Sequence, residues 1–173
     1  MAVDMFLKLE PIKGESQDKA HKDEMDILAW SWGMSQSGTT HMGKGSGSGK
    51  ANFQDLSVTK YVDSASTDLM KFCTMGSHIE QGTLVVRKAG GGQMEYIVLD
   101  MADIIISSIS TGGSGGEDRL TENVSLNFGA YNIQYVPQTE TGAPDTATTW
   151  QWDIAQNTEA FDETPHTPAG PQK

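Results

Sequence analysis

The sequence predicts a mainly-β domain of the barrel or sandwich type, and two observations support this fold class. Residues 120–136 alternate apolar and polar side chains over a long stretch, which is the pattern of a half-buried strand. Most other apolar segments also alternate, and only residues 66–75 show the spacing of a helix. A chain organised around so long a strand is expected to be mostly β.

The alternation in residues 120–136 changes phase near Gly129. Even positions carry the apolar side chains before it and odd positions carry the large ones after it, as in Leu120, Val124, Leu126, Phe128 and Ala130, then Tyr131, Ile133 and Tyr135. A shift by one residue turns every later side chain to the opposite face, and bulges at glycine produce such shifts. We therefore expect one strand that bends at Gly129 and Ala130 and crosses from one sheet to another.

Three shorter segments that precede this strand also alternate and are predicted as strands: residues 5–9, 27–36 and 53–62. The charged, non-periodic residues 13–26 are expected to form a surface loop. Residues 27–36 place large side chains at Leu28, Trp30, Trp32 and Met34, and mostly small ones at Ile27, Ala29, Ser31, Gly33 and Ser35. Such a strand packs one face and presents a smooth second face.

The one predicted helix spans residues 66–75, with Ser66 as its N-cap and Gly76 just past its end. Residues 83–88 and 94–101 predict a hairpin with a glycine-rich turn. Residues 104–110 lead into the long strand, and residues 150–154 are the last strand. We expect one β-barrel domain over residues 1–156 and a disordered tail over residues 157–173, which hold three prolines without any pattern.

The chain has 12 basic and 23 acidic residues, a formal net charge of -11. This charge argues against nucleic acid as a partner. Cys73 is the single cysteine, so no intrachain disulfide forms. The first residues lack the pattern of a cleaved signal peptide, and no apolar run is long enough to cross a bilayer. We expect a protein made in the cytoplasm that has no membrane partner.

No motif in the sequence predicts catalysis, a cofactor or a metal site. His21, His41, His78 and His166 do not pair with one another or with Cys73 at metal-ligand spacing. Residues 38–45 resemble a phosphate-binding loop, but glycine follows the lysine where Ser or Thr is needed. Cys73 lies on the apolar stripe of the predicted helix, so it is expected to be a core residue. The chain is therefore expected not to be an enzyme.

Four segments resemble the Hcp family, the secreted tube protein of the bacterial type VI secretion system. They are GESQDKAHKDEMDILAWSWGMSQSG, LSVTKYVDSASTDLMKFCTMGSH, LVVRKAGG and ISSISTGGSGGEDRLTENVSLNF. The resemblance covers about residues 1–136, and the strand with Trp150 and Trp152 also fits. It implies a β-barrel of two sheets flanked by one helix, similar to phage tail-tube proteins.

The resemblance also implies a structural function. It implies that copies form hexameric rings, which stack into a tube inside a contractile sheath and under a VgrG-like spike. It further implies that small effector proteins travel in the lumen and that the tube leaves the cell without a cleaved signal peptide. The alternatives are a monomeric ligand-binding β-barrel with a pocket between its sheets, and an enzyme on a β-sandwich. A measured particle mass several times that of the chain would favour the ring-forming tube protein over these two alternatives.

Two groups of residues are candidate sites in such a tube. Residues 37–50 are rich in Gly and Ser and cannot fold alone, so we expect them to contact an adjacent subunit or ring through His41, Lys44, Gly45, Ser46, Gly47, Ser48 and Lys50. The alternative is a surface loop without a partner. Ala29, Ser31 and Gly33 are expected to face the lumen near effectors; the alternative is that this face packs under a neighbouring loop.

Overall fold

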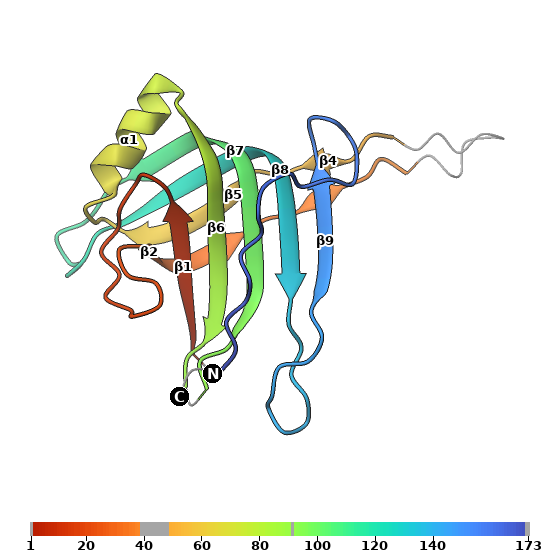
Figure 1. Ribbon diagram of the computed structural model, residues 1–173. Helices are drawn as coiled ribbons and strands as arrows, with labels where there is room; N and C mark the ends of the chain where they lie inside the picture. Colours follow the sequence, from red (N-terminus) through yellow and green to blue (C-terminus); the bar gives the residue numbers. More distant parts are fainter. Residues whose placement is uncertain (1, 39–48, 91, 172–173) are drawn as a thin grey trace.

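The chain in this computed structural model closes into a β-barrel with one flanking helix (Figure 1). The structure describes residues 2–38, 49–90 and 92–171. Its elements in chain order are β1 (Val3–Leu9), β2 (Met25–Ser31), β3 (Met34–Ser35), β4 (Asn52–Phe53), β5 (Leu56–Tyr61), α1 (Ser66–Met75), β6 (His78–Lys88), β7 (Glu95–Thr111), β8 (Thr121–Tyr135) and β9 (Thr148–Asp153). The predicted mainly-β barrel with a flanking helix is confirmed.

Seven strands form one antiparallel sheet in the order β5-β2-β1-β6-β7-β8-β9. Because β5 also pairs with β8, the first six of these strands close the barrel and β9 extends the sheet beyond it. β3 and β4 form a separate two-stranded ribbon that projects from the barrel in Figure 1. One continuous sheet therefore forms the barrel wall.

β8 is the predicted long strand, and it has two different neighbours on the side away from β7. Its first half pairs with β5 from Thr121 to Leu126, and its second half pairs with β9 from Ala130 to Tyr135. Ala130 and Tyr131 are buried in succession, so the inward-facing positions change phase between the two halves. The predicted phase change is confirmed, and it falls where β8 leaves the seam with β5.

β7 pairs with β8, and its backbone conformation and register are irregular near this bend. Asp103, which lies opposite Gly129 in the register, has a left-handed backbone conformation with φ 54°. The register shifts between Ile106 and Ser108, so the bulge lies in β7, although the sequence predicted it at Gly129 in β8. The two predicted segments at residues 94–101 and 104–110 are joined in this single strand.

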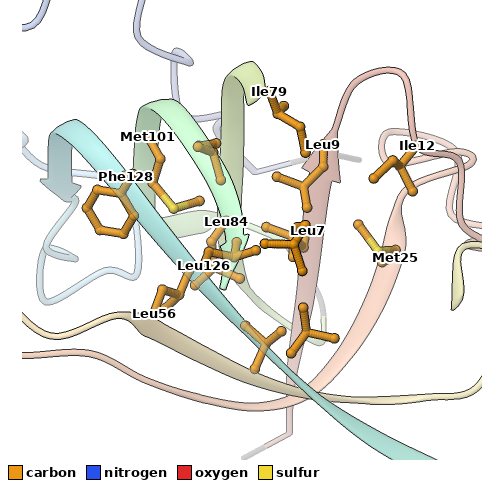
Figure 2. Close-up of a cluster of buried hydrophobic side chains, with 14 of the residues drawn as sticks. Leu7, Leu9, Ile12, Met25, Leu56, Ile79, Leu84, Met101, Leu126 and Phe128 are labelled. Atoms are coloured by element: carbon orange, nitrogen blue, oxygen red, sulfur yellow. The ribbon is translucent and has the colours of Figure 1, made fainter. Parts of the chain in front are cut away.

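Apolar side chains from every barrel strand fill the interior (Figure 2). The largest include Leu7 and Leu9 of β1, Leu84 of β6, Leu99 and Met101 of β7, Leu126 and Phe128 of β8, Leu56 of β5, and Met25 of β2. Burial of each such side chain contributes about 1.5–3 kcal/mol. The alternating sequence pattern therefore produces one closed apolar core.

β2 contains a bulge that the sequence pattern did not predict. The register with β5 shifts between Ile27 and Ala29, and the intervening Leu28 is 41% exposed. Ile27 is buried, although the alternation grouped it with Ala29 and Ser31. Beyond the bulge Trp30 and Trp32 pack partly against the core as predicted, whereas Met34 is 48% exposed.

The helix α1 has the predicted bounds, but Ser66 is not its N-cap. Ala65 occupies the cap position without a side-chain cap bond, and the Ser66 hydroxyl instead donates to the buried carboxylate of Glu122 at 2.6 Å. At the other end Gly76 takes the left-handed conformation, with φ 61°, as predicted. Leu69 is fully buried in the core. Cys73 is partly exposed and packs against the core cluster.

Residues 157–171 differ from the expected disordered tail. They lie along the outside of the barrel wall, as the dark blue segment of Figure 1 shows. Side chains of β6, β7 and β8 bond their backbone at Thr164, His166 and Ala169. The prediction was wrong because these contacts come from strands distant in sequence.

Candidate functional site

The outer surface of four strands carries small, uncharged side chains in two rows across β2, β5, β8 and β7. The register pairs Ser31 with Ser57, Ser57 with Ser125, and Ser125 with Ser108; the second row is Ala29, Thr59, Asn123 and Ser110. Residues directly opposite in antiparallel strands share a face of the sheet. We call these eight residues the polar face.

The polar face follows from the same alternation that builds the core. In β5 and β8 the polar positions lie between Leu56, Val58, Val124 and Leu126, which point inward and are at most 1% exposed. Successive side chains of a strand point to opposite faces, so the polar positions must point out. Short hydroxyl and amide side chains leave that face flat.

Charged groups lie only at the margins of the polar face, as far as the described residues show. At one margin the Asp55 carboxylate accepts hydrogen bonds from the Ser107 hydroxyl at 2.6 Å and the Asn127 amide at 2.9 Å. At the other, the Arg119 guanidinium lies 3.8 Å from the ring centroid of Tyr61. Both groups are held by neighbours, which leaves the two rows between them neutral.

The structure brings two of the three predicted lumen residues together. Ala29 and Ser31 are exposed on β2 within the polar face. Gly33 lies beyond the end of β2, where its carbonyl oxygen accepts a hydrogen bond from the Gln54 amide at 2.9 Å. Ala29 and Ser31 are exposed, whereas Gly33 is half-buried.

Six residues of the polar face were not singled out from the sequence: Ser57, Thr59, Ser108, Ser110, Asn123 and Ser125. Ser57, Thr59, Asn123 and Ser125 occupy the polar parity of alternating segments, whereas Ser108 and Ser110 share the parity of the buried Ile104 and Ile106 and face outward because of the bulge in β7. The sequence pattern did not give the pairing of β5 with β2 and β8, or of β8 with β7, which places these positions side by side.

The predicted contact loop falls mostly outside the described residues, since His41, Lys44, Gly45, Ser46, Gly47 and Ser48 belong to residues 39–48. Lys50 is described and is exposed. The flanking ribbon is anchored to the barrel by Trp32, whose indole N–H donates to the Gln54 carbonyl at 2.9 Å and whose ring lies 4.7 Å from that of Tyr131. Because Trp32 precedes the loop and Gln54 follows it, this contact holds the segments on both sides of the loop together.

β9 forms an edge of the sheet among the described residues, because β8 is its one neighbour there. Trp150 on this strand is 45% exposed, and Tyr135 at the end of β8 is 50% exposed. The rings of Trp150 and Trp152 stack with centroids 6.0 Å apart. An exposed edge with large aromatic side chains favours contact with another protein chain.

Core side chains fill the barrel interior among the described residues. Within them, no group of three or more His, Cys, Asp and Glu side chains could hold a metal ion. Nor does any described helix have the length and apolar character to span a bilayer. A cleft of about 730 Å³ lies on the outer wall between Lys8, Glu80 and His166, while the core side chains occupy the interior.

Comparisons with known proteins agree with this architecture. A family model of the type VI secretion system effector Hcp matches residues 6–135. Protein hcp1 of Pseudomonas aeruginosa is 55% identical over 162 residues, which cover 92% of this chain and 100% of that protein. Hcp1 from Salmonella typhimurium has a crystal structure with a TM-score of 0.77 at 37% identity, covering 92% of this chain and 100% of its own. A type VI secretion system effector from Yersinia pestis has a TM-score of 0.72 at 32% identity, covering 87% and 99%. The chain therefore belongs to the Hcp family and is a tube component of the type VI secretion system.

Proposed function

We propose that copies of this chain close into hexameric rings whose bore is lined by the polar face, and that the rings stack into the tube. The observation that carries this proposal is the continuous neutral surface across β2, β5, β8 and β7. Cargo in a bore must be held weakly enough to leave. Small neutral side chains suit this need, because they make no strong ion pairs with a passing protein.

Ring closure uses two different surfaces on each copy, so that each subunit contacts the next in the same way. The exposed edge of β9 with Trp150 and Tyr135 supplies one such surface. Residues 37–50 supply a further contact to the adjacent subunit or ring. Their position between the strands of the anchored β3–β4 ribbon supports this role.

The other partners follow from the place of Hcp in the secretion system, where it is a secreted structural protein. The rings bind a VgrG-like spike at one end, run inside the sheath proteins, and carry small effector proteins in the lumen. The chain is cytoplasmic before firing and extracellular afterwards. It has no catalytic activity of its own, and the monomeric ligand-binding alternative is not favoured.

Electron microscopy and native mass measurement of the purified protein test the ring. We expect particles with a central hole and a mass six times that of the chain. Trp150→Glu should shift the mass toward the single subunit, whereas Leu120→Glu, which alters a residue 43% exposed away from β9, should not. A wild-type protein that remains a single subunit at micromolar concentration contradicts the proposal.

A further inference from the structure

The geometry points to a pH-dependent clasp that holds residues 157–171, which we call the strap, against the barrel. Glu95 at the start of β7 is the centre of the clasp, and its side chain is 2% exposed. One carboxylate oxygen lies 3.0 Å from Nε2 of His21, and the other lies 2.7 Å from Nε2 of His166 in the strap. The clasp is independent of the proposed role of the polar face.

The backbone of the strap adds further contacts to the clasp. The Ala169 amide donates to Glu95 Oε2 at 2.9 Å, and the Ala169 carbonyl accepts from the Glu95 amide at 3.2 Å. The His166 amide donates to the buried Asp100 carboxylate at 3.0 Å. The side-chain amides of Gln81 and Gln134 donate to strap carbonyl oxygens at 2.8 Å each.

These polar contacts dominate the attachment, because none of residues 157–171 is fully buried. An attachment with little apolar burial depends on its hydrogen bonds and charges. The strap is therefore expected to respond to protonation more strongly than the core strands beneath it, which are also held by apolar packing.

The charges that surround the two histidines come from every element near them. His21 in the loop before β2 also lies 2.9 Å from the Glu24 carboxylate, and its ring stacks on Phe6. His166 faces Glu95 and Asp100 of β7. Arg87 of β6 lies opposite Glu95 in the register, but its guanidinium is bonded to Asp18 and Asp4. The neighbouring cleft adds Lys8, Glu10, His78 and Glu80.

The protonation states favour a closed clasp near neutral pH. Burial alone lowers the pKa of His21, but the hydrogen bonds to Glu24 and Glu95 outweigh it and raise that pKa to about 9. The hydrogen bond to Glu95 raises the pKa of His166 above its ordinary value of 6.5. Histidines with raised pKa values stabilise the docked strap fully below pH 6.5, and this contribution is lost as the pH rises through their folded-state pKa values.

Opening of the clasp changes the outer wall of the barrel. Thr164 and His166 form part of the rim of the outer cleft, so their departure widens it. The carboxylates of Glu95 and Asp100 lose their strap partners at the same time. The barrel thus has a covered state, and an open state with an acidic patch on β7.

Hydrogen exchange of the intact protein, followed by mass spectrometry, tests the clasp. Amide protection of residues 157–171 is compared at pH 6.5 and pH 9.5, with an unstructured peptide of the same sequence correcting for the intrinsic rates. We expect the corrected protection of the strap to fall by roughly tenfold, the effect of replacing a hydrogen bond between charged groups by one from a neutral imidazole. Protection of β7 should stay constant.

The variant His166→Gln removes the titrating group from the strap and leaves the core intact. It should lower strap protection at pH 6.5 and reduce its pH dependence. The matched control is His78→Gln, which removes an exposed histidine paired with Asp103 and should behave like the wild type. Wild-type strap protection that does not change with pH, or the same pH dependence in His166→Gln, overturns the inference.

Discussion

Lys60 and Glu122 form an ion pair whose two side chains are both 0% exposed. The Lys60 ammonium group donates to the Glu122 carboxylate at 2.7 Å, directly across the seam where β5 closes the barrel on β8. It also donates to Asp63 at 2.8 Å, next to the start of α1. The pair therefore joins the barrel seam to the helix, at the end of the inward-facing rows of β5 and β8.

Removing one partner of this pair should destabilise the fold strongly. Lys60→Met leaves the Glu122 carboxylate buried without its partner, which typically costs about 3–5 kcal/mol. The double variant Lys60→Met with Glu122→Leu removes both charges and should cost much less. Urea denaturation of the three proteins measures the difference. Equal losses of stability in the single and double variants would show that the pair is not coupled.

Gly82 should not tolerate even a methyl group. A Cβ at this position would lie 2.5 Å from Leu9 Cδ2 and 2.8 Å from Ile104 Cδ1, inside the packed core. Gly82→Ala should therefore lower the free energy of unfolding by about 1–3 kcal/mol through overpacking. Gly112→Ala is the matched control, because nothing lies within 4 Å of its Cβ. Similar melting temperatures for both variants would contradict the expected crowding.

Acid should weaken the contribution of Glu95 to stability. Burial raises the pKa of Glu95, but hydrogen bonds from His166 and His21 outweigh it and lower that pKa to about 2, from an ordinary 4.5. A lowered pKa stabilises the fold above pH 4.5, and this contribution is lost as the pH falls through about 2. The melting temperature of Glu95→Gln should therefore lie below that of the wild type at pH 6 and approach it near pH 2. A difference that is constant over this range would contradict the assignment.

Ser31→Gln should reduce retention of cargo while leaving the ring intact. A longer side chain on β2 disturbs the flat surface formed with Ser57 and Ser125. The readout is the amount of small protein that copurifies with tagged rings, quantified by mass spectrometry. Thr74→Gln, on the exposed side of α1, is the control. Unchanged copurification with Ser31→Gln would argue against a bore lined by the polar face.

Deletion of residues 46–49 tests the proposed contact loop. The segment is Ser-Gly-Ser-Gly and carries no apolar side chain, so circular dichroism and the melting temperature of the subunit should stay close to those of the wild type. Ring or tube assembly, followed by electron microscopy, should be impaired. Normal rings and tubes from the deletion variant would assign the segment to the surface without a partner.

Much of the fold could be predicted from the sequence because alternation is a local property. Each strand shows which of its positions are apolar, and the burial of Val124, Leu126 and Tyr131 follows from that pattern. The helix bounds were predicted for the same reason, since the apolar spacing and the final glycine lie within one segment. The lumen candidates Ala29 and Ser31 came from the small side chains of β2 and from the family resemblance.

The tertiary structure alone decided which strands meet and which polar groups are satisfied. The pairing of β5 with β8 depends on residues about 65 positions apart, as in Leu56 with Leu126 and Tyr61 with Thr121, and no local pattern encodes such a partner. The strap is a second segment whose structure no local sequence pattern predicts. Its sequence has no periodicity, and its order depends on Glu95 and Asp100, which the fold of β7 places beneath it. Side-chain pattern determined the elements, while long-range pairing determined the barrel, the polar face and the clasp.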